Sequence, residues 1–357
     1  MLRAALVLVA WAWLAASPPR ALADEASDEI ADLAVLSFPS PVGPIRYVPG
    51  AGLHVGDTRL TIGGYSTLSF THDEGGPTRL GLDDLSFLIS WNPLPRLRFF
   101  SELEIENLFE VEDEGRSGAD LRFNAERVYG DLAISDQLNL RVGKFLTPVG
   151  RWNVIHAEPL VWTTSRPLAT ELGFDQHTTG AMLFGSWFGS RGVVNYSIYG
   201  QFVNQLGRKP DDFDPADRSA GARLEYSTTD RELSLGLSYY GSVQNGDWQT
   251  LFGADGLWRH GPLELTGELI ATTSRGPDAP EWGFYTQAVF DVLGPLFLVT
   301  RYEHFDQRQP EPQVNLVDLG IAYKPLPYLV LKAEYLIADH PAAAEPPGFK
   351  SSVAVLF

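Results

Sequence analysis

The sequence predicts an all-β protein, a sixteen-stranded antiparallel transmembrane β-barrel over residues 58–357. Three observations predict this fold. Short runs rich in β-branched and aromatic residues recur between turn clusters, at the spacing of barrels and sandwiches. The connections between these runs alternate between short and long. The longest connection, Pro148 to His177, fits neither a strand nor a helix.

The first 23 residues have the pattern of a secretory signal peptide. Arg3 supplies the positive start, Ala4 to Ala16 is an apolar run, and small residues precede the expected cleavage before Asp24. A retained N-terminal anchor is the alternative, but the apolar run is too short to span a membrane as a helix. We therefore expect an exported protein, and without cysteine it cannot form the disulfides common among such proteins.

Composition excludes several classes of protein. The 357 residues fit one large all-β domain or two ordinary ones. Removal of residues 1–23 leaves 25 basic and 45 acidic residues, a net charge of about −20 with neutral histidines. Such a charge disfavours nucleic acid as a partner. No later segment approaches the roughly 20 apolar residues of a membrane helix, so a membrane-embedded form would have to be a barrel.

The stretch 24–57 precedes the strand pattern and is expected to be an N-terminal periplasmic segment. It opens with acidic residues and then carries Pro39, Pro41, Pro44 and Pro49. This density of proline predicts an extended leader.

From Thr58 onward, period-2 alternation and turn residues delimit the strands. The expected strands are 58–71, 79–91, 96–109, 119–134, 137–147, 178–188, 193–203, 218–228, 232–243, 248–260, 262–274, 281–292, 295–306, 313–324, 327–338 and 349–357. An even number of strands is typical of bacterial barrels that span the outer membrane.

The connections sort by length. Even-numbered strands are followed by turns of one to four residues, such as Ser135-Asp136 and Leu293-Gly294, and odd-numbered strands mostly by longer polar loops. Short turns at one rim and long loops at the other are typical of a transmembrane barrel. A soluble sandwich has no physical reason to segregate its loops in this way.

Within strands, aliphatic and charged residues alternate between the two faces. A sandwich gives the same pattern, so alternation alone does not choose between the folds. In a barrel, the charged face would line the lumen, with Arg122 included if its strand keeps register. The expected wall residues are Arg96, Arg98, Glu102, Glu104, Glu106, Arg122 and Arg141.

Tryptophans near strand ends favour the membrane barrel, because amphipathic rings gather at both membrane interfaces. The expected interface residues are Trp91, Trp187, Trp248, Trp258 and Trp282. The chain ends in an alternating strand with a terminal aromatic residue, Phe357. This end resembles the C-terminal strand that the outer-membrane assembly machinery of Gram-negative bacteria recognises.

Taken together, residues 58–357 resemble a bacterial outer-membrane porin, and the run VGKFLTPVGRW, Val142 to Trp152, is similar to a strand-to-loop junction of the phosphate-selective porin O/P-like group. The resemblance implies a homotrimer in outer-membrane lipid, with the third external loop, residues 148–177, folded into the lumen and narrowing it. The anion specificity of that group rests on rows of Arg and Lys, whereas this chain is acidic overall.

A barrel of this size leaves a water-filled channel, so the expected function is passive diffusion of small hydrophilic solutes or ions. A phosphate- or anion-selective porin is the first alternative. Selectivity would arise at the narrowest point, where charges act at close range. The expected constriction residues are Arg151, His156, Glu158, Arg166, Glu171, Asp175 and His177.

Catalytic chemistry finds little support. The seven histidines lack metal-ligand spacing such as HExxH, there is no GxSxG, and no motif calls for a cofactor. An outer-membrane hydrolase or surface protein without channel activity remains an alternative, since His156 or His177 with Ser165 and an acidic residue could imitate a catalytic triad. We expect no catalytic residue, no metal and no cofactor.

Overall fold

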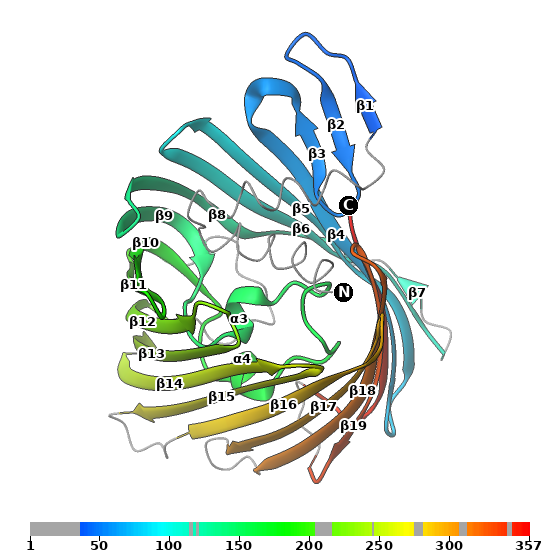
Figure 1. The fold of residues 1–357 in the computed structure, drawn as a ribbon. Coiled ribbons are helices and arrows are strands. Elements are labelled where there is room, and N and C mark those ends of the chain that lie inside the picture. Colours follow the sequence, from blue (N-terminus) through cyan, green and yellow to red (C-terminus); the bar gives the residue numbers. More distant parts are fainter. Residues whose placement is uncertain are drawn as a thin grey trace.

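The computed structural model describes residues 36–113, 117–118, 121–203, 216–244, 246–274, 281–306, 313–340 and 345–357. The expected signal peptide, 1–23, and the first part of the expected periplasmic segment lie outside these residues. Sixteen of the strands form one antiparallel ring (Figure 1). They are β4 (Leu60–Asp73), β5 (Thr78–Leu94), β6 (Leu97–Glu112), β8 (Arg122–Ser135), β9 (Leu138–Leu146), β10 (His177–Phe188), β11 (Gly192–Gln201), β12 (Arg218–Thr228), β13 (Leu233–Gln244), β14 (Asp247–His260), β15 (Leu263–Ser274), β16 (Glu281–Leu293), β17 (Leu296–Asp306), β18 (Val314–Leu326), β19 (Leu329–Ala338) and β20 (Gly348–Leu356).

Pairing of the first and last strands closes the ring. β20 runs antiparallel to β4, from Gly348 opposite Asp73 to Leu356 opposite Tyr65. A two-residue strand, β7 (Ser117–Gly118), pairs with the C-terminal part of β6. The prediction of sixteen strands is confirmed, and each expected boundary lies within three residues of the observed one.

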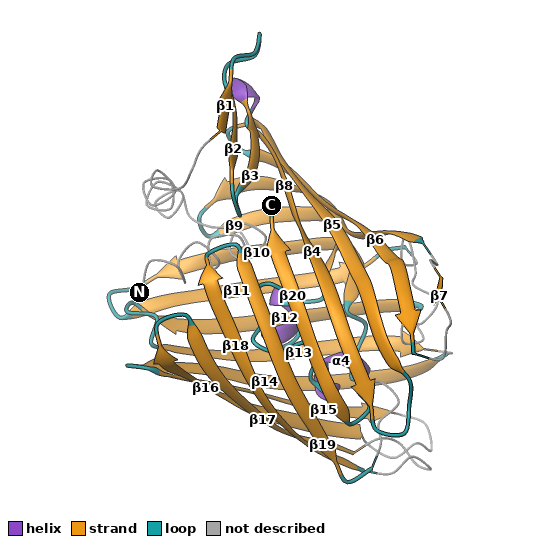
Figure 2. Ribbon diagram, turned by 90° about the vertical axis from the view of Figure 1, so that its right-hand side faces the viewer, coloured by secondary structure: helices purple, strands orange, loops and turns teal. Residues whose placement is uncertain are grey.

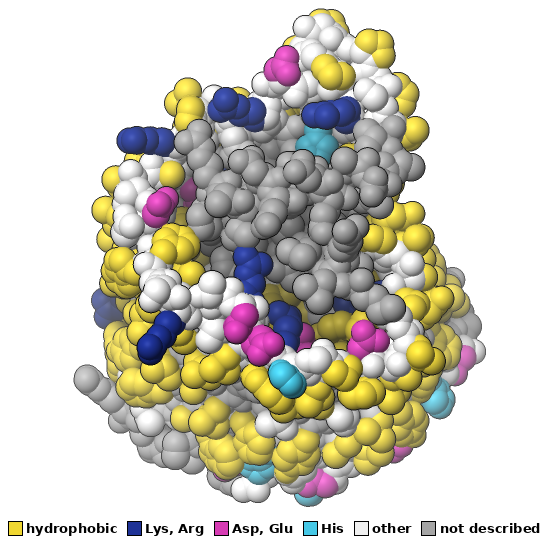
Figure 3. Space-filling view, in the orientation of Figure 1, with side chains coloured by type: hydrophobic (Ala, Val, Ile, Leu, Met, Phe, Trp, Pro, Cys, Tyr) yellow, Lys and Arg dark blue, Asp and Glu magenta, His cyan; other side chains and the backbone are white. Residues whose placement is uncertain are grey.

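The alternation of outward apolar and inward charged side chains explains why this sheet closes on itself. In β17, Leu298 and Tyr302 are 49% and 41% exposed on the outside, whereas Arg301 and Glu303, which point inward, are each 1% exposed. An open sheet would leave edges unpaired, and closure removes them. In Figure 3, hydrophobic side chains dominate much of the outer contour, and several charged side chains lie toward the middle of the face shown.

The N-terminal segment is more structured than a simple extended leader. β1 (Leu36–Phe38), β2 (Ile45–Val48) and β3 (Gly52–Val55) form an antiparallel sheet, and a single 3₁₀ turn, η2 (Gly56–Thr58), leads into β4. Pro39, Pro41 and Pro44 lie in the connection between β1 and β2, where no ladder hydrogen bond is lost. The sheet extends beyond the barrel rim (Figure 2).

The long connection between β9 and β10 contains two short helices, α3 (Trp152–Ile155) and α4 (Leu168–Leu172), which the sequence pattern did not predict. Figure 1 shows both inside the ring of strands, and α4 contacts β15, β16 and β17. Leu168 and Phe174 of this connection join the buried cluster that includes Tyr240, Leu251 and Ile270 of the wall. Among the described residues, no helix is long and apolar enough to cross a membrane.

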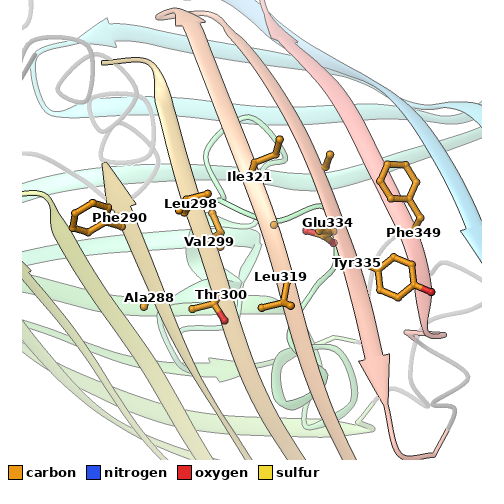
Figure 4. A pocket seen from close by; sticks show the side chains of 12 residues that line it. Ala288, Phe290, Leu298, Val299, Thr300, Leu319, Ile321, Glu334, Tyr335 and Phe349 are labelled. Atoms are coloured by element: carbon orange, nitrogen blue, oxygen red, sulfur yellow. The ribbon is translucent and has the colours of Figure 1, made fainter. Parts of the chain in front are cut away.

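An apolar groove of about 640 Å³ crosses the outer face of β16–β20 (Figure 4). Leu298 lies opposite Ile321, and Leu319 opposite Tyr335, in neighbouring strands that line it. The groove belongs to the apolar exterior, whereas the inward loop and the charged residues lie on the other side of the wall.

Candidate functional site

The candidate site is the barrel lumen together with the connection 147–176, hereafter the inward loop. Its apolar residues pack against the wall: Val149 and Leu168 are fully buried, and Phe174 is nearly so. The beginning of the loop is fixed by Glu268 of β15, whose Oε1 accepts hydrogen bonds from the Trp152 N–H at 2.6 Å and the Tyr285 hydroxyl at 2.8 Å. The loop is therefore part of the packed interior.

Two carboxylates among the expected constriction residues bond to groups outside the inward loop. Glu158 accepts a hydrogen bond from Lys332 Nζ at 2.6 Å and one from the Ser352 hydroxyl at 3.0 Å. Asp175 accepts hydrogen bonds from the Tyr240 hydroxyl at 3.1 Å and the Ala216 N–H at 2.7 Å. Both carboxylates thus hold the loop in place as well as carrying charge.

Arg166 and Glu171 remain partly exposed on the loop. Their charged groups lie 3.3 Å apart, and the side-chain amide of Gln176 bonds to both, at 2.7 Å from Arg166 Nη1 and 3.0 Å from Glu171 Oε2. The Arg166 guanidinium lies 5.1 Å from the centre of the Trp152 ring. The pair is held in one geometry with nearly balanced charge.

The remaining three expected loop residues differ in their surroundings. His177 is the first residue of β10, and its Nε2 lies 2.5 Å from Glu126 Oε2 of the wall. Burial of the His156 ring, reinforced by the positive charges of Arg127 and Arg166, holds its pKa well below the ordinary 6.5. His156 is therefore neutral near pH 7. Arg151 precedes α3 and is half-buried.

The expected wall residues lie along one side of the barrel. Arg98, Glu102, Glu104 and Glu106 are on β6, and Arg122 is opposite Glu106 on β8. Arg96 is a correction: it lies exposed in the turn between β5 and β6, because β5 continues to Leu94 and leaves only two residues to reverse the chain.

Acids and bases on this wall are interleaved and do not form opposing rows. Arg141 of β9 donates from Nε to Asp131 Oδ1 at 2.7 Å and stacks 3.7 Å from the centre of the Tyr129 ring. Arg127 donates to the buried Glu102. Glu104, Glu106 and Glu126 place carboxylate oxygens within 4.8 Å of one another. Three carboxylates thus gather in the middle of the wall, with Arg122 opposite one of them, Glu106.

The triad suggested for Ser165 is not assembled. The Ser165 hydroxyl accepts a hydrogen bond from Arg301 Nη2 at 2.6 Å and approaches Asp318 Oδ2 at 3.4 Å. Both partners come from the wall, and neither is the histidine that the suggested triad requires.

Sequence reasoning missed the wall residues that hold the loop. Their inward position could be read from strand parity, as Glu264 and Glu268 show by alternating with leucines. Their role could not, because each partner lies more than 100 residues away in the chain. The missed wall residues are Glu268, Arg301, Glu303, Lys332 and Glu334. Glu345, which accepts the Arg166 N–H, lies in the connection between β19 and β20 and was also missed.

The five tryptophans lie at strand ends, as expected. Trp91, Trp187 and Trp258 are within three residues of the ends of β5, β10 and β14, and all three are exposed. Trp248 and Trp282 are the second residues of β14 and β16. Several stack on neighbouring rings, for example Trp187 on Tyr196 at 4.6 Å between centres.

Comparison by sequence assigns no family to this chain. No family model matches the chain. A protein of Aquifex aeolicus (strain VF5), described only as uncharacterized, is 24% identical over 382 residues, covering 88% of this chain and 86% of its own length.

Solved outer-membrane proteins share the architecture at low identity. Salmonella typhi OmpF in complex with daunomycin gives a TM-score of 0.62 at 10% identity, over 90% of this chain and 99% of OmpF. The anion-selective porin from Comamonas acidovorans gives 0.58 at 16%, over 83% and 98%. The trimer form of OmpT, an outer membrane protein of Vibrio cholerae, gives 0.57 at 12%, over 84% and 99%. The chain therefore has the sixteen-stranded barrel fold found in these proteins.

Proposed function

We propose that the protein is an outer-membrane porin through which small hydrophilic solutes or ions diffuse passively. The observation that carries this proposal is a closed barrel with a charged inner wall, an apolar exterior and a polar loop packed inside. Polar groups facing a lumen are stable when water fills the lumen, and apolar groups facing outward are stable in lipid.

The proposal assigns a role to each part of the chain. Residues 1–23 are the signal peptide, 24–57 the periplasmic segment, and 58–357 the barrel in the outer membrane of a Gram-negative bacterium. The strand-end tryptophans lie at the two lipid interfaces. The strand ending at Phe357 is presented to the assembly machinery.

We propose that residues 148–177 form the constriction, because the inward loop narrows the lumen that remains between it and the wall of β4–β9. Arg166 and Glu171 of the loop are partly exposed there, and Glu104, Glu106 and Glu126 line the opposite wall. Because bases and acids are both present and many are paired, we expect weak ion selectivity with some preference for cations.

An anion- or phosphate-selective channel is the alternative. It is favoured by Arg98, whose buried Nε and Nη2 have no hydrogen-bond partner among the described residues, and by the fold shared with an anion-selective porin. The phosphate-selective group is a narrower version of this alternative.

The test is the zero-current potential of the purified protein in a planar bilayer under a KCl gradient, with and without phosphate. A small zero-current potential whose sign indicates a preference for cations supports the proposal. A strong anion potential, with chloride current blocked by phosphate, supports the alternative. No conductance from folded protein would favour a surface protein or a hydrolase over a channel.

We also propose a homotrimer, by likeness to the trimer form of Vibrio cholerae OmpT. Chemical cross-linking in detergent, followed by denaturing gels, should give a ladder that ends at three subunits. A ladder ending at the monomer would contradict the trimer without affecting the channel proposal.

A further inference from the structure

One short stretch of the inward loop meets three adjacent strands of the wall, β17 through Arg301, β18 through Asp318 and β19 through Glu334. Ser165 is 1% exposed, and each of its polar atoms has a partner there. Its N–H donates to Glu334 Oε1 of β19 at 2.6 Å, and its carbonyl oxygen accepts from Arg301 Nη1 of β17 at 3.1 Å. Its hydroxyl accepts from Arg301 Nη2 at 2.6 Å. Charged side chains of the wall therefore hold this point of the loop.

Arg301 is the centre of this contact. Its Nη1 also donates to Thr163 Oγ1 at 2.6 Å, and its Nε donates to Glu303 Oε1 at 2.6 Å. The guanidinium is planar and presents its five donors in a fixed fork, so these bonds define its position and that of the loop together.

Wall carboxylates accept the backbone N–H groups of the same stretch. Glu334 accepts from Thr164 at 2.9 Å as well as from Ser165, and Glu303 Oε2 accepts from Leu168 at the start of α4 at 2.7 Å. Buried N–H groups need partners, and those of Thr164, Ser165 and Leu168 find theirs in carboxylates of the wall. The fold of the loop here therefore depends on charges of the wall.

We propose that Arg301 and Glu334 are positioning residues that set the width of the channel by holding Ser165 against the wall. We call Ser165, Arg301, Glu303 and Glu334 the loop clasp. The inference rests on the proposed function, because a constriction has a measurable width only if the protein conducts.

Removing Arg301 would leave Glu303 and Glu334 buried with one cation fewer, and would remove three bonds to the loop. Breaking a buried charged contact is strongly unfavourable for the bound state. We expect detachment of the loop from the wall to become about a hundredfold more frequent in Arg301→Gln.

Two readouts test this. Arg301→Gln should show a higher and noisier single-channel conductance than the unchanged protein, and faster protease cleavage within residues 160–168. Arg127→Gln is the matched control for cleavage, since Arg127 is also a buried wall arginine but bonds to Glu102 of the wall. Unchanged conductance and unchanged cleavage in folded Arg301→Gln would overturn the inference.

A disulfide tether tests whether Arg301 acts by positioning the loop or through its own charge in the channel. The chain has no cysteine, and the hydroxyl oxygens of Thr164 and Ser352 are 2.9 Å apart. In Arg301→Gln carrying Thr164→Cys and Ser352→Cys, the oxidised form should regain the original conductance and cleavage rate, and a reductant should reverse both. An oxidised tether that restores neither would overturn a positioning role.

The outcomes distinguish the two proposals. If the unchanged protein conducts no current while Arg301→Gln still accelerates cleavage, the channel proposal fails and the clasp stands. If Arg301→Gln does not fold, the tether is placed in the otherwise unchanged chain. Failure of the two cysteines to join there would then show that the loop does not lie against β20.

Discussion

Single residues at the start of the inward loop carry strict geometric requirements. Gly150 has φ of +65°, and a Cβ added there would meet Glu268 Oε2 at 2.0 Å, beside the carboxylate oxygen that accepts the Trp152 N–H. Gly150→Ala should therefore lower the free energy of unfolding by about 3 kcal/mol, from backbone strain and a weakened bond to a charged acceptor. Urea titration of the protein in vesicles measures this change.

Gly75→Ala is the matched control. Gly75 has φ of +76°, and among the described residues no atom lies within 4 Å of an added Cβ. Only the strain of the left-handed backbone applies, about 1–2 kcal/mol. If both variants lose the same stability, the contact with Glu268 contributes nothing and the loop start is looser than described.

Because His156 is neutral in the fold, we expect the stability of the protein to depend on pH. Its pKa is lowered in the fold by burial and then by Arg127 and Arg166, whereas the unfolded chain titrates near 6.5. Below about pH 6.5 the unfolded chain therefore binds a proton that the folded chain does not, and stability falls by up to about 1.4 kcal/mol per pH unit. His156→Gln should lose about 1 kcal/mol less than the unchanged protein between pH 7.5 and 5.5 in urea titrations. Parallel losses would mean that His156 is protonated in the fold.

At the scale of elements, the N-terminal sheet and the barrel are separable. β3 pairs with β4 only at Leu53 opposite Ile62 and His54 opposite Thr61, whereas β20 pairs with β4 over nine residues. Deleting residues 36–55 should therefore leave the barrel closed and its single-channel conductance unchanged. Far-ultraviolet circular dichroism and bilayer recordings check this, and a chain that no longer folds would show that the sheet nucleates closure.

The elements also show how far sequence reasoning reaches. Strands such as β12 (Arg218–Thr228) were predicted to the residue because alternation and turn residues are local signals. The helices α3 and α4 were not predicted, because four or five residues are too few to display a helical period. The contact of Ser165 with Arg301 joins positions 136 residues apart, and only the closed barrel brings them together.

At the scale of the whole molecule, the fold depends on joining the two ends of the sheet, and the last residue takes part. Phe357 exchanges two backbone hydrogen bonds with Gly64, each 2.9 Å long, and its ring lies 6.1 Å from that of Phe87. A Cβ on Gly64 would meet the Phe357 ring at 2.7 Å, so glycine makes room for it. The ring therefore packs on the wall next to the seam between β4 and β20.

The variant Phe357→Ala distinguishes a role of the terminal ring in stability from a role in assembly. It keeps the backbone bonds and removes one ring contact, so the purified chain should refold in vesicles with a loss of about 1 kcal/mol. In cells, however, it should accumulate much less in the outer membrane, because the terminal ring is proposed to present the last strand to the assembly machinery. Phe290→Ala is the control, since Phe290 is an exposed ring of the outer face away from the terminus, 45% exposed. The amount of each variant in membrane fractions is measured on gels. Equal accumulation of the two variants would show that Phe357 has no role in assembly and contributes only to packing beside the contact between β4 and β20.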